Sequence, residues 1–146
     1  QLNIDHENKN ILDVGTGTGV LAIMGYKLGA KSITATDIDD WCIENSMENF
    51  KLNQVENFEI LQGTIDKLTL PGSYDIIYAN INKNVLLKEI PLYSNILHET
   101  GILLLSGFYF DDIDDLKEKA TQNQLISEHT KTRNNWAMMH LSHSKI

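Results

Sequence analysis

Residues that cross-link or break small folds are scarce in this chain, which has one cysteine and two prolines among 146 residues. The single Cys42 excludes an internal disulfide framework and fits a reducing compartment, so we expect a cytoplasmic protein. No run of about 18 apolar residues occurs, and we expect no contact with a membrane. The first residues are polar and acidic, which is unlike a secretory signal peptide.

Basic residues are also in the minority, with 12 Lys and Arg against 20 Asp and Glu and a formal net charge of −8. Strong sequence-independent binding of nucleic acid needs clustered Lys and Arg, so we do not expect it here. The acidity is compatible with a basic protein substrate, but it can equally serve only to keep the domain soluble. The sequence leaves the oligomeric state open.

The length of the chain fits one domain with a full-sized core. We therefore expect a single domain over residues 1–146. The chain begins without a methionine, and the first strand is predicted only about ten residues in. Since open α/β domains usually carry a helix or another domain before that strand, we expect a C-terminal fragment of a longer protein.

Strand and helix patterns alternate along the sequence, which indicates an α/β fold with a parallel sheet. The predicted strands cover 10–14, 32–36, 57–62, 74–79, 102–106, 125–132 and 136–142. The predicted helices cover 19–28, 40–53, 83–98 and 111–122. The last two strands are joined by a short polar connection, which predicts an antiparallel hairpin.

A glycine-rich segment joins the first predicted strand to the first predicted helix. Such a turn lets a ligand approach the backbone closely and directs the free N–H groups of the helix start toward it. The dinucleotide fingerprint G-x-G-x-x-G fails here, because Val20 stands where the last glycine should be. The pattern D-x-G-x-G-x-G instead resembles the loop of methyltransferases that use S-adenosylmethionine. That resemblance implies cofactor contacts from Asp13, Gly15, Thr16, Gly17 and Gly19.

Asp37 directly follows the second predicted strand. An acid at that place can accept hydrogen bonds from both ribose hydroxyls of an adenosine, and Ile38 beside it is a further candidate contact. The alternative is that Asp37 only caps the next helix, a role that we expect of Asp39 or Asp40. Asp13 can be a buried carboxylate that holds the loop backbone, which does not exclude a cofactor role.

Two further strand ends supply candidate residues. Gly63 and Thr64 follow the third strand. Many methyltransferases have an acid after this glycine that meets the adenine amino group, so with Thr64 there, backbone groups are expected to substitute. Asn80 ends the fourth strand, and its amide offers an acceptor and two donors to a ligand at the carboxyl ends of the strands. Its alternative role is a plain helix cap.

The chain resembles, over nearly its whole length, the family of ribosomal protein methyltransferases that modify the large-subunit L-eleven protein. The segments that carry the resemblance are 11–23, 36–39, 79–81 and 105–107, together with Trp136. It implies a Rossmann-like sheet of seven mostly parallel strands with helices on both faces and a C-terminal antiparallel hairpin. It also implies S-adenosyl-L-methionine as the cofactor, an amine of a ribosomal protein as substrate, and Gly15, Asp37 and Asn80 as cofactor residues. The family carries a separate N-terminal domain that grips the substrate.

The chemistry expected of this site needs no metal and no covalent intermediate. Asn80 is the candidate catalytic residue, because its amide could orient the amine while bulk water takes the proton. Phe108 and Tyr109 could line the substrate entrance or belong to the core. Other classes remain open, namely a methyltransferase for a small molecule or RNA, a nicotinamide-binding module, and a non-catalytic module that binds the cofactor.

Overall fold

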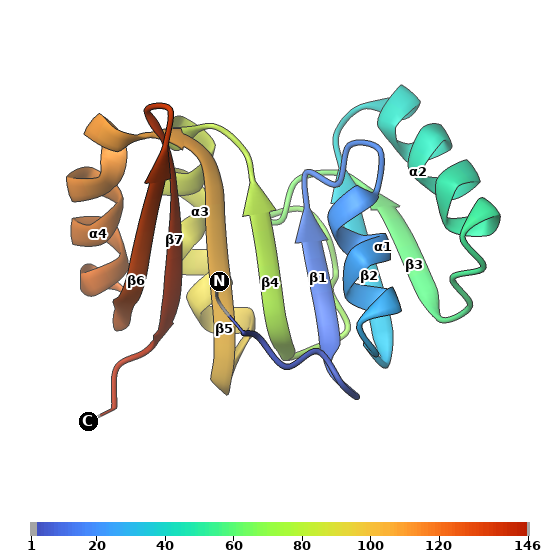
Figure 1. Ribbon diagram of the computed structural model, residues 1–146, viewed down its shortest axis with the longest axis horizontal. Coiled ribbons are helices and arrows are strands. Elements are labelled where there is room, and N and C mark those ends of the chain that lie inside the picture. The colour runs from blue at the N-terminus through green and yellow to red at the C-terminus, as the bar shows by residue number, and fades with distance from the viewer. Residues whose placement is uncertain (1–2, 146) are drawn as a thin grey trace. The chain divides into compact units, whose positions relative to one another are not determined.

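The computed structural model describes residues 3–145 and divides the chain into two compact units, residues 1–69 and 70–146. Figure 1 labels their helices and strands. Within the described residues, no helix is long and apolar enough to cross a membrane.

The first unit is a β-α-β-α-β segment built from β1 (Asn10–Val14), α1 (Val20–Lys27), β2 (Ser32–Asp37), α2 (Asp40–Leu52) and β3 (Phe58–Gln62). Its strands lie in the order β3-β2-β1, and all pairings are parallel. The register pairs Asp13 with Ala35 and Asp37 with Gln62. Parallel pairing brings the carboxyl ends of these strands to one edge, where the loops after β1, β2 and β3 meet.

The core of the first unit explains why this register is stable. Ile11, Leu12 and Ile33 are almost completely buried, as expected of strands covered on both faces. From α2, the ring of Phe50 meets that of Phe58 edge to face, with centroids 5.0 Å apart. The side chain of Asp39 caps α2 by accepting hydrogen bonds from the next turn. Asp39 and Asp40 were the predicted alternatives for this cap, and the cap is Asp39.

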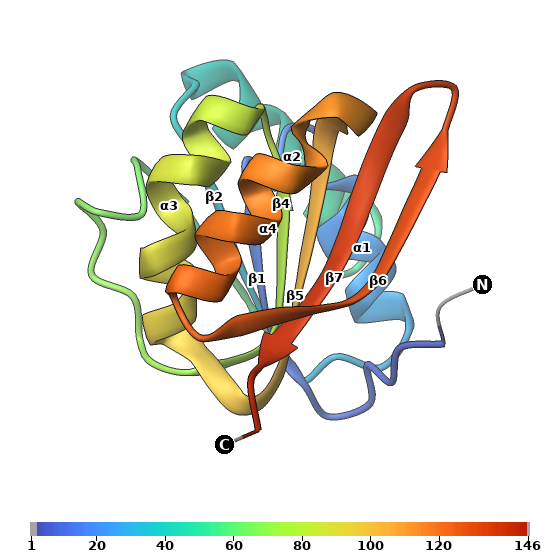
Figure 2. The ribbon, with the colours of Figure 1, turned by 90° about the vertical axis from the view of Figure 1, so that its left-hand side faces the viewer.

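The second unit contains β4 (Tyr74–Asn80), α3 (Lys83–Ile96), β5 (Leu97–Tyr109), the short 3₁₀ helix η1 (Phe110–Asp112), α4 (Ile113–Gln122), β6 (Leu125–Arg133) and β7 (Trp136–His143). The strands follow the order β4-β5-β7-β6. β4 and β5 are parallel, whereas β7 is antiparallel to both β5 and β6. In Figure 2, α3 and α4 run side by side, and β6 and β7 form the long predicted hairpin.

The predicted α/β class and its antiparallel ending are confirmed, and most element bounds agree within two residues. The exception is the strand predicted at 102–106, which extends over Leu97–Tyr109. The apolar run on which the prediction rests covers only the middle of the strand. The first residue, Leu97, joins the strand because it pairs with Tyr74 of β4, and polar residues follow it. The helix predicted at 111–122 begins instead as η1, so its regular part starts only at Ile113.

Candidate cofactor site

The loop between β1 and α1 is held in one conformation by backbone hydrogen bonds. The N–H of Thr16 donates to Thr36 O at 2.9 Å, and the N–H of Gly19 donates to Thr16 O at 2.9 Å. From α2, Nδ2 of Asn49 donates to Thr18 O at 2.8 Å. The loop is therefore preorganised, so a ligand would meet a backbone that is already ordered.

Two glycines of this loop have different environments. Both have positive φ, +57° at Gly17 and +85° at Gly19, where a Cβ is strained. A Cβ on Gly19 would lie 2.7 Å from Cε1 of Phe50, so this glycine is required by core packing. A Cβ on Gly17 would meet no heavy atom of the described residues within 4 Å beyond its chain neighbours. The open space at Gly17 is what close approach of a ligand requires.

Asp13 lies under this loop with 1% of its surface exposed. Its Oδ2 accepts a hydrogen bond from Oγ1 of Thr16 at 2.8 Å. Burial raises the pKa of Asp13 to about 7, and the hydrogen bonds from Thr16 and the Ala22 backbone only partly oppose this. This geometry fits the structural role expected of Asp13, and it engages the Thr16 hydroxyl within the loop.

The raised pKa of Asp13 predicts how stability depends on pH. The folded state holds this proton more tightly than the unfolded chain, so stability falls as the pH rises from about 4 to about 7. Each pKa unit corresponds to about 1.4 kcal/mol, so we expect a loss on the order of 2–4 kcal/mol over this range. Asp13→Asn, which cannot ionise, should lack this part of the slope. Urea unfolding of both proteins at several pH values measures the difference, and identical slopes would contradict this prediction.

Asp37 connects the end of β2 to the glycine loop. Its Oδ2 accepts the N–H of Gly17 at 3.0 Å, and its Oδ1 accepts the N–H of Asp39 at 3.1 Å. A carboxylate offers about four acceptor positions, so it can accept further hydrogen bonds from a diol. The capping alternative for Asp37 is wrong, because Asp39 Oδ1 accepts the N–H of Trp41 at 2.8 Å.

Cys42, at the start of α2, neighbours the same carboxylate. Desolvation raises the pKa of its thiol, and the negative charges of Asp37 and Asp39 and a hydrogen bond with Asp37 raise it further. The thiol therefore stays protonated at neutral pH, unlike the thiolate that a nucleophilic cysteine requires.

The segment after β3 lies beside Asp37. The N–H of Gly63 donates to Asp37 O at 2.9 Å, which ties the two strand ends together. Among the described residues, Oγ1 of Thr64 is buried without a hydrogen-bond partner. A buried polar atom without a partner lowers the stability of the fold, and a ligand that forms a hydrogen bond with it would remove this penalty. The apolar side chain of Ile38, next to Asp37, is 70% exposed and free to cover a ligand.

Asn80 belongs to the second unit, where it ends β4 with an exposed side chain. It pairs in register with Ser106 of β5. The cap of α3 is Asn82, whose Oδ1 accepts the N–H of Val85 at 3.2 Å. The helix-cap alternative for Asn80 is therefore wrong, and its amide is left for another role.

The structure separates the two aromatic residues predicted near the end of β5. Phe108 is buried in the core, with 1% of its surface exposed. Tyr109 is half exposed and stacks on Trp136 of β7, with ring centroids 4.5 Å apart. Only Tyr109 remains a candidate for the substrate entrance.

A comparison with protein families now decides the relationship. The family model described as ribosomal protein L11 methyltransferase (PrmA) matches residues 2–144. The chain belongs to the ribosomal protein L11 methyltransferase family. The resemblance predicted from the sequence motifs is thereby confirmed.

Curated members of this family are similar along most of the chain. The ribosomal protein L11 methyltransferase of Porphyromonas gingivalis is 46% identical over 138 residues, which cover 94% of this chain and 48% of the relative. That of Bacteroides thetaiotaomicron is 42% identical over 136 residues, covering 93% and 49%. The chain thus spans about half the length of the curated relatives it matches.

A solved structure confirms the fold class. The ribosomal protein L11 methylase of Lactobacillus delbrueckii subsp. bulgaricus has a TM-score of 0.90 and 30% identity, covering 95% of this chain and 72% of that one. The predicted Rossmann-like methyltransferase fold with seven mostly parallel strands is therefore confirmed.

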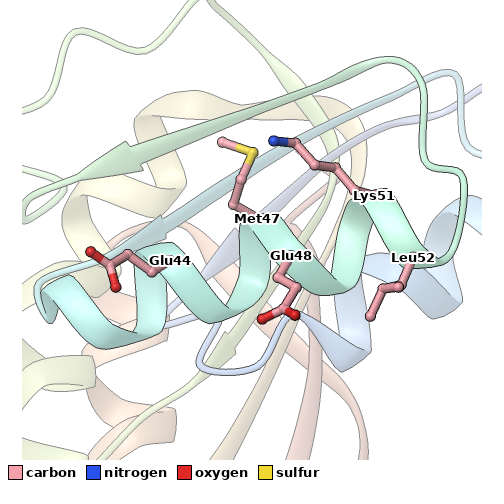
Figure 3. A pocket seen from close by; sticks show the side chains of 5 residues that line it. All are labelled: Glu44, Met47, Glu48, Lys51 and Leu52. Atoms are coloured by element: carbon pink, nitrogen blue, oxygen red, sulfur yellow. The ribbon is translucent and has the colours of Figure 1, made fainter.

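One surface hollow of this L11 methyltransferase family member involves none of the predicted cofactor residues. A shallow hollow on the outer side of α2 is lined by Glu44, Met47, Glu48, Lys51 and Leu52 (Figure 3). None of these residues belongs to the predicted site. Within residues 3–145, no group of three or more His, Cys, Asp and Glu side chains is placed to hold a metal ion.

Proposed function

We propose that this chain is the cofactor-binding and catalytic part of an S-adenosylmethionine-dependent methyltransferase. The observation that carries the proposal is the ordered glycine loop with open space at Gly17, joined to the carboxylate of Asp37. Membership of the ribosomal protein L11 methyltransferase family supports the same conclusion.

The residues of the first unit fit an adenosine-containing cofactor. Asp37 would accept hydrogen bonds from the ribose hydroxyls, and Ile38 would cover the adenine. Gly63 and Thr64 would face the adenine edge, where the buried Thr64 hydroxyl gains a partner. Asp13, Gly15, Thr16, Gly17 and Gly19 would shape the loop that holds the methionine end.

The cofactor would supply a methyl group already activated on a sulfonium, so the protein mainly positions the reactants. Asn80 would contact the cofactor and hold the acceptor amine with its amide oxygen. The amine must arrive unprotonated, or lose its proton to bulk water, before it attacks. No residue of this chain has to form a covalent bond.

We propose ribosomal protein L11 as the substrate, modified at a lysine or N-terminal amine, because the curated relatives carry that name. A ribosomal substrate would place the enzyme in the cytoplasm. The alternatives are methylation of a small molecule or of RNA, and cofactor binding without turnover.

A transfer assay distinguishes these substrates. The protein in its full natural length is incubated with methyl-labelled S-adenosylmethionine and, separately, with purified ribosomal proteins, ribosomal RNA and a metabolite extract. We expect label in the L11 fraction, and at least about fivefold less label when Asp37→Ala replaces the wild type at a cofactor concentration near the wild-type Kd, where a tenfold weaker variant is mostly unoccupied. Label confined to RNA or metabolites would contradict the substrate assignment, and binding without any transfer would favour the non-catalytic module.

A further inference from the structure

The strand that faces Asn80 contains a local irregularity. On β5, Leu105 pairs with Met139 of β7, but Phe108 pairs with Ala137, so three steps along β5 match two along β7. The extra residue lies within Ser106–Gly107, and Ser106 is itself the partner of Asn80 on β4. Such bulges often lie next to active sites, where they redirect a neighbouring group.

Gly107 leaves room for the end of β4 at this bulge. It has φ +84°, which other L-residues rarely adopt. A Cβ on Gly107 would lie 2.8 Å from Oδ1 of Asn80 and 3.0 Å from both N and O of Ile81. The absence of a Cβ at Gly107 thus leaves the room that the amide oxygen of Asn80 and the backbone of Ile81 need.

The segment after Asn80 is also held at its far end. Nζ of Lys83 lies 2.5 Å from Oδ2 of Asp115 and 3.4 Å from Oδ1 of Asp112. The other oxygen of Asp112 accepts the N–H of Tyr109 at 2.9 Å. An ion pair and a hydrogen bond therefore link the start of α3 to the segment that follows β5.

We propose that Gly107 is a positioning residue of the methyl-transfer reaction, which fixes the Asn80 amide by leaving its own Cβ position empty. This inference rests on the proposed role of Asn80. In this proposal, the bulge at Gly107 determines the position of the amide oxygen of Asn80.

The test compares Gly107→Ala with Gly72→Ala, a matched control whose glycine also has positive φ but whose Cβ would meet no described heavy atom within 4 Å. Gly107→Asn is the second variant, because Asn tolerates positive φ better and separates contact from backbone strain. In the full natural protein, we expect Gly107→Ala to lower kcat at least tenfold, with Gly72→Ala unchanged.

The double variant Gly107→Ala with Asn80→Ala distinguishes an effect through Asn80 from a general loss of structure. If Gly107 acts through Asn80, Gly107→Ala should lower kcat by less than about threefold in an Asn80→Ala background, because coupled residues are not additive. Full multiplication of the two losses would overturn the proposal. So would an unchanged kcat in Gly107→Ala while Asn80→Ala is impaired.

A second readout does not depend on activity. In protein with ¹⁵N-labelled asparagine, the side-chain amide signals of Asn80 are those that Asn80→Ala removes. We expect these signals to move in Gly107→Ala and Gly107→Asn and to stay in place in Gly72→Ala. Unmoved signals in both Gly107 variants would overturn this inference even if the proposed methyl transfer were correct. Moved signals in a protein without transfer activity would support the contact and reject only the proposed function.

Discussion

Replacing Asp37 by alanine should weaken the binding of S-adenosylmethionine at least tenfold. Two hydrogen bonds from ribose hydroxyls would be lost, and bonds to a charged acceptor are worth about 1.5–3 kcal/mol each before desolvation. The loop would also lose the acceptor for the N–H of Gly17. Isothermal titration of the wild type and the variant measures this change.

Two further variants sharpen this test. Asp37→Asn keeps one acceptor oxygen without the charge, so its affinity should lie between those of the wild type and Asp37→Ala. Asp39→Ala removes the cap of α2, which should lower stability by about 1 kcal/mol but leave cofactor affinity within a few-fold. An unchanged affinity in Asp37→Ala would reject the ribose assignment.

The second large effect is expected at Gly19, where alanine should destabilise the fold. Its Cβ would overlap the ring of Phe50, which is fully buried, in addition to the strain of a positive φ. Backbone strain of about 1–2 kcal/mol and overpacking of about 1–3 kcal/mol together predict a loss on the order of 2–5 kcal/mol. Chemical unfolding of the variant measures this loss directly.

Gly17→Ala is the matched control two residues away. We expect it to have a small effect on stability and a large effect on cofactor affinity. It should cost stability only the backbone strain, because its Cβ meets open space. That space is where the cofactor is proposed to lie, so affinity should fall at least tenfold. The assignment of the loop is contradicted if Gly17→Ala binds the cofactor as the wild type does.

The parts of this fold that the sequence predicts well are those with a local physical cause. The strand over Asn10–Val14 and the helix over Asp40–Leu52 were predicted within a residue, because their apolar spacing and capping residues are read along the chain. The early start of β5 was not, since Leu97 joins the strand through pairing with Tyr74. Which residues of two distant segments pair with each other cannot be read from the sequence of either segment.

The same division holds for the candidate site. The positions of Gly17 and Asp37 follow from the loop motif and the strand end, but the hydrogen bond between them depends on how β1 and β2 align. The contact between Gly19 and Phe50 was not foreseen, nor was that between Gly107 and Asn80. Each joins residues far apart in sequence, so only the register of the strands and the packing of α2 reveal it.

The most direct test of the central claim is a calorimetric titration of S-adenosylmethionine and S-adenosylhomocysteine into this chain and into the protein of full natural length. We expect saturable binding of one cofactor per chain, and no comparable binding of NAD. Measurement at two temperatures guards against a binding enthalpy near zero. Absence of binding by both proteins, each shown to be folded, would contradict the account.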